Sequence, residues 1–352
     1  MISIWCDFIE REFLRLDFRE LVNKGLVNGA TSNPNIFAEA LKGDSYSNDI
    51  EFIFNDSSIQ SMPKDMQKKA IYEHLALQDI KIAADILLPL YDENPMNGLI
   101  SIEIDPYFCN NIDSSVNEGK RLWESLKCSN VMIKVPATSS GFVIMEQLMS
   151  IGINVNATLV FSQEQAQKTL KAFQEGYKQL NKNLASPNAS INHAVANPQG
   201  VISVFVSRFD REIDSKLDFS LRGKYGICNA TVIYHDFLTR NNNKNFRILF
   251  ASTGVKEQNS TYNDLGYYVY PLAFPDCINT VPLSTLRSIN YDRLDGQVSS
   301  EFSNSLLNDI RDRLHVIGVD YRHVEANLLD QGLRSFQASF KDMLDSLVKK
   351  DN

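Results

Sequence analysis

The chain has 352 residues, of which 43% are hydrophobic and 22% are charged, and its formal net charge is −8 at pH 7. This length allows one large α/β barrel or two ordinary domains, and the composition is that of a soluble globular protein. The acidic balance and the lack of a Lys/Arg block argue against a nucleic-acid partner, although a few local cations would suffice for an anionic substrate.

The five cysteines are scattered, and none lies in a C-x-x-C pair. We therefore expect no disulfide framework and no zinc site, and a cytoplasmic protein. The chain begins with a strand-like run at residues 2–5 and shows neither a basic region nor a long apolar segment there. This pattern predicts neither a signal peptide nor a membrane-spanning segment.

In chain order, eight short apolar runs predict strands, and most of them are separated by helical patterns. The strands are expected at residues 2–6, 26–31, 99–104, 130–135, 154–161, 201–209, 246–251 and 278–281. The helices are expected at residues 11–24, 66–88, 141–150, 163–181, 210–217 and 227–240, with two or three more between about residues 299 and 350. The polar stretch at residues 183–200 is interpreted as a loop on the substrate side rather than as a domain linker.

This alternation predicts a single (β/α)₈ barrel domain over residues 1–352. Additional helices are expected between the second and third strands and at the C-terminus, where the helices from about residue 300 pack on the barrel. The alternative is an open doubly wound sheet, but no strand is followed by a G-x-G-x-x-G or P-loop sequence. In a barrel the catalytic groups lie at the C-terminal ends of the strands, so polar residues at those ends become candidates.

Lys134 lies in the middle of an apolar strand that Pro136 ends. A buried lysine is unusual because its ammonium ion loses its hydration. Desolvation favours the neutral amine, which is a nucleophile toward carbonyl groups. We interpret Lys134 as a candidate Schiff-base lysine. The alternatives are a lysine that reaches solvent from a strand end or one that pairs with an acid.

Further candidates lie at or just beyond the ends of the other predicted strands. They are Asp7, Asn33, Glu103, Asp105, Asn156, Thr158, Ser203, Phe205, Ser207 and Arg208. Structural explanations are also open: Asp7 and Asn33 could cap helices, and Arg208 could pair with Asp210 or Asp214. If these groups converge around a lysine, they provide the nucleophile, the proton shuttle and the hydroxyl-binding groups that amine catalysis needs. The five histidines show no ligand spacing, so no metal or other cofactor is expected.

Four segments resemble the signature motifs of the transaldolase family and occur in the family's order. They are residues 29–34 (GATSNP), 131–138 (VMIKVPAT), 156–162 (NATLVFS) and 201–211 (VISVFVSRFDR). The resemblance extends from Asp7 to about Pro282, and residues 203–210 and 251–256 are similar to the longer bacterial branch. It implies a metal-independent transferase of the pentose phosphate pathway that carries a dihydroxyacetone unit between sugar phosphates. Sedoheptulose 7-phosphate and glyceraldehyde 3-phosphate would give erythrose 4-phosphate and fructose 6-phosphate.

The resemblance also implies roles for the site residues. Lys134 would form the Schiff base, and Asp7 would take the proton from the hydroxyl beside the bond that breaks. Glu103 and Thr158 would hold a water that shuttles protons. The remaining residues would bind the substrate. Asn33 and Asn156 would bind the hydroxyls of the dihydroxyacetone unit. The acceptor side would be contacted by Ser203, Phe205 and Arg208, and Arg208 would bind the phosphate.

One departure from the family pattern concerns the phosphate. The shorter branch carries an arginine just after the seventh strand, whereas residues 252–254 here are Ser-Thr-Gly, and Lys256 is the expected replacement. An aldolase of the same fold that releases free dihydroxyacetone is the main alternative, but such lyases carry a tyrosine where this chain has Phe205. A non-catalytic barrel scaffold would not need Lys134 and Asp7 together. We expect a monomer or a homodimer.

Overall fold

The structure is a computed structural model, and it describes residues 2–41, 43–185, 195–255, 262, 264–294 and 300–347. Within these residues, eight parallel strands form a closed barrel, in which each strand pairs with the next in the chain and the last pairs with the first. This confirms the predicted (β/α)₈ barrel, and the open doubly wound sheet is excluded. The strands are β1 (Ser3–Cys6), β2 (Gly29–Thr31), β3 (Leu99–Glu103), β4 (Val131–Pro136), β5 (Asn154–Val160), β6 (Gly200–Phe205), β7 (Phe246–Ala251) and β8 (Ile278–Val281).

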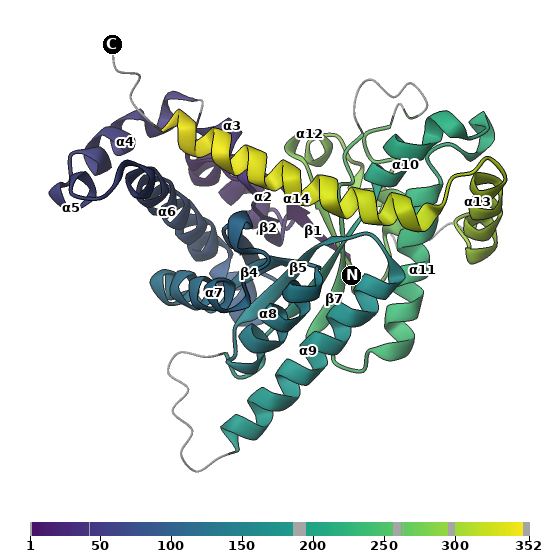
Figure 1. The fold of residues 1–352 in the computed structure, drawn as a ribbon, viewed down its shortest axis with the longest axis horizontal. Helices are drawn as coiled ribbons and strands as arrows, with labels where there is room; N and C mark the ends of the chain where they lie inside the picture. Colours follow the sequence, from purple (N-terminus) through teal and green to yellow (C-terminus); the bar gives the residue numbers. More distant parts are fainter. Residues whose placement is uncertain are drawn as a thin grey trace.

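Helices surround the barrel and bury the outer faces of the strands (Figure 1). The long helices are α6 (Lys64–Glu93), α7 (Ile112–Leu126), α8 (Ser139–Ser150), α9 (Gln163–Leu184), α11 (Tyr225–Arg240), α13 (Asn304–Val316) and α14 (Tyr321–Ser346). The short ones are α1 (Arg11–Phe13), α2 (Arg19–Asn23), α3 (Pro34–Ala40), α4 (Ser47–Phe54), α5 (Ser57–Gln60), α10 (Ser207–Ile213) and α12 (Leu283–Leu286). Every strand residue is buried, which explains why the strands read as nearly continuous apolar runs.

The C-terminal helix α14 crosses the molecule rather than lying beside one strand (Figure 1). It contacts α3, α6, α10, α13 and the β5 strand. Figure 1 shows it in yellow, running from beside α3 and α4 toward α13. The helix α14 therefore packs on the end of the barrel at which β2 and β5 finish, which is the C-terminal end of the strands.

The sixth strand is shorter than the sequence predicted. β6 ends at Phe205 and α10 begins at Ser207, so Ser207 and Arg208 lie on a helix and not on a strand. The β-branched and aromatic residues of this stretch favour a strand, but Phe209 and Ile213 are one helical turn apart and are both buried. Burial of this helical face overrides the local strand preference.

Other boundaries follow the prediction closely or lie partly outside the described residues. β7 and β8 have the predicted bounds, and the predicted helix at residues 11–24 includes a π-helical turn, Leu14–Phe18, between α1 and α2. In the predicted polar loop, α9 continues to Leu184, and residues 186–194 are not among those described. Among the described residues, no helix combines the length and the apolar character needed to cross a membrane.

Candidate active site

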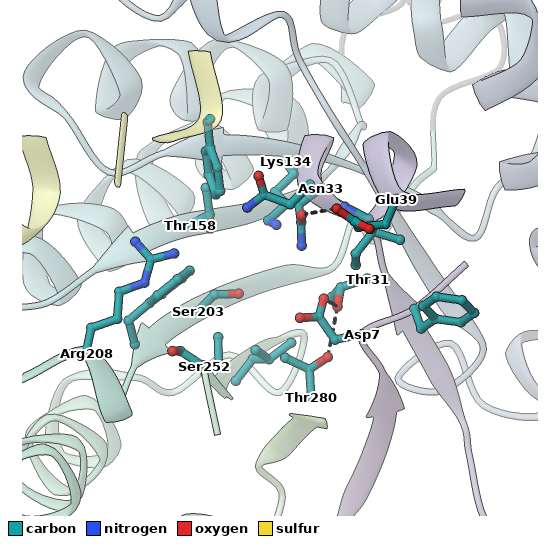
Figure 2. A pocket seen from close by; sticks show the side chains of 17 residues that line it. Asp7, Thr31, Asn33, Glu39, Lys134, Thr158, Ser203, Arg208, Ser252 and Thr280 are labelled. Carbon is teal, nitrogen blue, oxygen red and sulfur yellow. Dashed lines mark hydrogen bonds between the residues drawn. The ribbon is translucent and has the colours of Figure 1, made fainter. Parts of the chain in front are cut away.

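A cavity of about 360 Å³ opens at the C-terminal ends of the barrel strands (Figure 2). The strands β2, β4, β5, β6, β7 and β8 contribute to its lining, as do the segment directly after β1 and the helices α3, α10 and α14. Its polar and charged lining residues include Asp7, Thr31, Asn33, Asn35, Glu39, Lys134, Thr158, Ser203, Arg208, Ser252 and Thr280. Of the predicted site residues, the cavity brings together Asp7, Asn33, Lys134, Thr158, Ser203, Phe205 and Arg208, whereas Glu103 and Asn156 do not line it.

Lys134 points into the barrel because of the side-chain alternation along β4. Its neighbour Ile133 faces α7, where its Cγ2 lies close to Gly119, so Lys134 lies on the opposite side of the strand. Lys134 is only 5% exposed, and its Nζ donates a hydrogen bond to the Ser32 carbonyl oxygen at 3.1 Å. Nζ also lies 3.5 Å from Glu103 Oε2. Lys134 is thus buried and paired with an acid, and it still lines the cavity.

Glu103 is a buried carboxyl group that stands next to the lysine. Strand pairing places it directly beside Lys134, and burial raises its pKa to about 7, although the nearby ammonium group of Lys134 opposes this effect. Apart from the ion pair, neither of its oxygens has a hydrogen-bond partner among the described residues, and the same is true of Thr158 Oγ1. Buried polar atoms normally have partners, so these atoms are suited to binding a water or a substrate hydroxyl.

Asp7 is held by a chain of two threonines that the sequence analysis did not single out. Thr31 Oγ1 donates to Asp7 Oδ1 at 2.6 Å and lies 2.8 Å from Thr280 Oγ1 (Figure 2). Because the single hydroxyl hydrogen of Thr31 goes to Asp7, Thr280 is the donor in the second contact. Strands β1, β2 and β8 thereby fix one carboxyl oxygen at the edge of the cavity.

Asn33 has both of the roles considered for it. Its Oδ1 accepts a hydrogen bond from the Ile36 backbone N–H at 3.2 Å and so caps α3, as the sequence pattern suggested. Asn33 also lines the cavity. With Oδ1 occupied by the cap, its amide Nδ2 is the group available to donate to a substrate oxygen.

Asn156 lies beneath the cavity floor and not on its surface. It is completely buried, its Nδ2 donates to Ser101 Oγ at 2.8 Å, and its Oδ1 accepts from Ser203 Oγ at 2.6 Å. Ser203 itself lines the cavity. Asn156 therefore connects β3, β5 and β6 and orients the Ser203 hydroxyl.

Arg208 projects from the first turn of α10 toward the cavity, and its guanidinium lies over the Phe205 ring, 4.9 Å from the ring centroid. It forms no ion pair within the described residues, so the pairing considered with Asp210 or Asp214 is wrong. Asp210 accepts instead from the Gly226 N–H, and Asp214 from the Tyr262 hydroxyl. Burial, together with the nearby Arg211, lowers the pKa of Arg208 to about 10. An unpaired guanidinium at a cavity wall is suited to an anion.

The remaining candidates do not belong to this cavity or cannot be placed. Asp105 faces away from it and pairs with Lys69 at 2.5 Å. Ser207 does not line the cavity, but its hydroxyl lies 3.0 Å from that of Ser252, which does. Lys256 lies outside the described residues. Within the part of the chain that the structure describes, no group of three or more His, Cys, Asp or Glu residues could hold a metal ion.

A residue from the far C-terminus also lines the cavity. Phe336, on α14, is 3% exposed, and its ring centroid lies 5.7 Å from Lys134 Nζ. Thr31 and Thr280 carried a weak sequence signal, because both are polar residues in otherwise apolar strands. Phe336 carried none, because it resembles any other apolar position of an amphipathic helix.

A buried lysine with acids and hydroxyl groups at the C-terminal mouth of a (β/α)₈ barrel defines a class of barrel enzymes that use an amine as nucleophile. A family model described as "Transaldolase/Fructose-6-phosphate aldolase" matches residues 4–347. The chain belongs to this family.

Curated relatives agree with this assignment. The chain is 40% identical over 345 residues to a transaldolase of Helicobacter pylori (strain Shi470), with 98% of each chain covered. It is also 40% identical over 350 residues to a transaldolase of Campylobacter jejuni subsp. jejuni serotype O:23/36 (strain 81-176), covering 98% of this chain and 99% of the relative. These matches confirm the predicted family and the predicted transaldolase activity, which is a transferase activity.

Proposed function

We propose that the protein transfers a dihydroxyacetone unit from a ketose phosphate to an aldose phosphate through a Schiff base on Lys134, in the pentose phosphate pathway of the cytoplasm. The observation that carries the proposal is the position of Lys134, which is buried beside Glu103 and lines a cavity that also contains Asp7 and Arg208, an arginine without an ion pair to any described residue. Sedoheptulose 7-phosphate and fructose 6-phosphate are the proposed donors, and erythrose 4-phosphate and glyceraldehyde 3-phosphate are the proposed acceptors. Lys134 provides the electron sink, so the reaction needs no metal or organic cofactor.

In the first half of the reaction, the neutral amine of Lys134 adds to the ketone carbon of the donor. Loss of water from this adduct leaves a positively charged imine, which is called the iminium below. Asp7 then takes the proton from the C4 hydroxyl, the C3–C4 bond breaks, and the electron pair of that bond moves toward the iminium nitrogen. An aldose phosphate leaves, and a neutral three-carbon enamine stays on Lys134.

The second half reverses these steps with a different aldehyde. The enamine carbon attacks the carbonyl carbon of the acceptor, Asp7 returns its proton to the new hydroxyl, and water hydrolyses the iminium to release the new ketose phosphate. Glu103 and Thr158 are proposed to hold the water that carries protons during formation and hydrolysis of the iminium. Their buried oxygens without hydrogen-bond partners among the described residues support this role.

The substrate is proposed to lie between the lysine and the arginine. Asn33, through its amide nitrogen, binds hydroxyls of the dihydroxyacetone unit. Ser203 contacts the acceptor side, and Asn156 acts by orienting Ser203. Arg208 binds the phosphate of the substrate, and Phe205 supports the guanidinium with its ring. Lys256 is the proposed second cation for the phosphate. The protein is proposed to work as a monomer or a homodimer.

An acceptor test distinguishes transfer from simple cleavage. The enzyme is incubated with fructose 6-phosphate, with and without erythrose 4-phosphate, and both sedoheptulose 7-phosphate and free dihydroxyacetone are measured. We expect sustained turnover only with the acceptor, because Phe205 has no phenol hydroxyl to position a water against the intermediate. Equal release of dihydroxyacetone with and without the acceptor would instead identify an aldolase, and no turnover in either case would indicate a binding protein.

A further inference from the structure

The C-terminal helix α14 brings an aromatic ring to the nitrogen at which the proposed chemistry takes place. Phe336 lines the cavity, and its ring centroid lies 5.7 Å from Lys134 Nζ. The mechanism described above assigns no task to this ring. A cation within about 6 Å of an aromatic ring centroid is attracted by the negative face of the ring, and the attraction grows when water is excluded. Phe336 and Lys134 are 3% and 5% exposed, so little water screens their contact.

The position of the ring is set by close packing of α14 on the barrel. Gly332 lies one turn before Phe336 on the buried face of the helix. A Cβ atom at Gly332 would lie 2.7 Å from Leu159 Cδ2 and 3.3 Å from Arg208 Nη1. Only a glycine lets the helix approach this closely without displacing a neighbour. One helix face therefore meets both ends of the cavity, with Gly332 beside Arg208 and Phe336 beside Lys134.

Contacts on the other side of Phe336 hold the helix in this register. The Gln337 side chain donates to the Pro106 carbonyl oxygen at 3.2 Å, and the Tyr107 hydroxyl donates to the Gln337 carbonyl oxygen at the same distance. One turn further along, the Phe340 ring packs edge-on against Tyr72, with centroids 5.2 Å apart. These contacts fix α14 to the segment after β3 and to α6, so the ring of Phe336 is held over the lysine.

The charge on the lysine nitrogen changes during the proposed reaction. It is positive in the iminium and neutral in the enamine that remains after the aldose phosphate has left. An aromatic face beside the nitrogen favours the positive form over the neutral one. We propose that Phe336 is part of the active site and that its aromatic face stabilises the positively charged iminium nitrogen of Lys134. This inference rests on the proposed function.

The test uses phenylalanine analogues with one, two, three or five ring fluorines, introduced at position 336 of the full chain. Fluorine withdraws electron density from the ring face while the ring shape changes little. Each protein is mixed with saturating fructose 6-phosphate without acceptor. The nucleophilic carbon of the three-carbon enamine then takes a proton from water, which gives a three-carbon iminium, and borohydride reduces this iminium to a stable adduct. The initial rate of this reduction is divided by the amount of glyceraldehyde 3-phosphate released in the first turnover. This amount equals the total of three-carbon intermediates, because each cleavage leaves one of them on Lys134. The normalised rate therefore reports the share of the intermediate that is iminium.

We expect the normalised rate to fall with each added fluorine, to a total of about three- to thirtyfold. Phe336→Leu keeps an apolar side chain but removes the ring. Its normalised rate should be as low as that of the protein with five ring fluorines. The matched control is the same analogue series at Phe340, a ring on the same helix face that packs on Tyr72. There the normalised rate should stay constant. Thermal unfolding of every variant is measured to confirm that the fold is kept.

A constant normalised rate across the Phe336 series overturns the inference, because the ring would then only fill space. Equal falls in the Phe336 and Phe340 series also overturn it, because fluorination would then act through helix packing. A protein with its natural Phe336 that forms no three-carbon adduct refutes the proposed function itself. The failure of the inference and the failure of the proposed function therefore give different results.

Discussion

Lys134 and Glu103 are paired in register on neighbouring strands, and Lys134 Nζ lies 3.5 Å from Glu103 Oε2. Burial of this pair raises the pKa of Glu103 to about 7. The carboxyl group therefore keeps its proton to a higher pH than a free glutamate does and can act as a proton donor there. This property connects the fold to the chemistry, because the alternation along β3 and β4 places both side chains inside the barrel.

The first prediction concerns the pH dependence of Schiff-base formation. Loss of water from the first adduct needs a proton donor, and Glu103 carries its proton below a pH of about 7 because burial raises its pKa. The dehydration rate should therefore fall as the pH rises through about 7. Glu103→Gln should lack this transition and form the adduct about 10²–10⁴-fold more slowly. Single-turnover trapping across a pH series measures both effects.

Asp105→Asn is the matched control for the Glu103 substitution. Asp105 follows the same strand, but its ion pair is with Lys69, whereas Glu103 pairs with Lys134. This variant should keep the transition near pH 7. If Glu103→Gln kept it too, Glu103 would not be the proton donor.

The second prediction separates cleavage from adduct formation. Asp7→Ala should still form the Schiff base, because Asp7 acts only after this step, but it should cleave the carbon–carbon bond about 10²–10⁴-fold more slowly. Trapping with borohydride and fructose 6-phosphate should then yield a six-carbon adduct in place of the three-carbon one, as mass spectrometry can show. Thr31→Val removes one hydrogen bond to Asp7 and should have a smaller effect of the same kind. Near-normal turnover by Asp7→Ala would exclude this role.

The third prediction concerns the phosphate. A hydrogen bond to a charged group contributes roughly 1.5–3 kcal/mol, so Arg208→Ala should raise KM for phosphorylated sugars by about ten- to a hundredfold. KM for unphosphorylated donors should change little. Arg211→Ala is the control, because Arg211 lies on the same helix but does not line the cavity. Steady-state kinetics with paired substrates test this selectivity.

Lys256→Ala should show the same selectivity with a smaller loss, since a lysine offers a point charge and no planar fork. If this variant left KM for phosphorylated sugars unchanged while Arg208→Ala raised it, another group would complete the phosphate site. If neither substitution mattered, the phosphate would bind elsewhere at the barrel mouth.

The fourth prediction concerns stability. Asn156 satisfies the hydroxyl groups of Ser101 and Ser203 inside the barrel, so Asn156→Ala leaves two buried hydroxyls without this partner. The free energy of unfolding should fall by about 1–3 kcal/mol, and urea denaturation measures this change. Ser203→Ala removes only one of these two hydrogen-bonded hydroxyls and should lower the free energy of unfolding by less. An unchanged denaturation midpoint for Asn156→Ala would mean that water replaces the amide.

The sequence predicted those parts of the fold that depend on local pattern. The bounds of β7 and β8 are as predicted, because each is a short apolar run with polar or turn residues on both sides. The boundary between β6 and α10 was wrong, because it depends on burial of Phe209 and Ile213 against neighbouring elements. The helix α7 was not predicted, because polar residues such as Glu118 and Ser115 occupy buried positions on it.

The candidate site was predictable to the extent that the strands carry it. Lys134, Glu103 and Thr158 follow from the rule that barrel enzymes place their chemistry at strand ends. Phe336 comes from α14, more than three hundred residues along the chain from Asp7, and only the tertiary structure brings it to the cavity. The hydrogen-bond partners of a polar group also cannot be predicted from sequence. Asp210 accepts from a backbone N–H and Asp214 from a tyrosine hydroxyl, and neither pairs with Arg208.

The measurement that tests the central claim most directly is the identification of the residue that carries the Schiff base. The protein is treated with fructose 6-phosphate and borohydride, digested, and analysed by peptide mass spectrometry. The account predicts a stable three-carbon adduct on the peptide that contains Lys134, loss of activity in parallel with its formation, and no adduct in Lys134→Met. An adduct on a different lysine, or full activity without any adduct on Lys134, would contradict it.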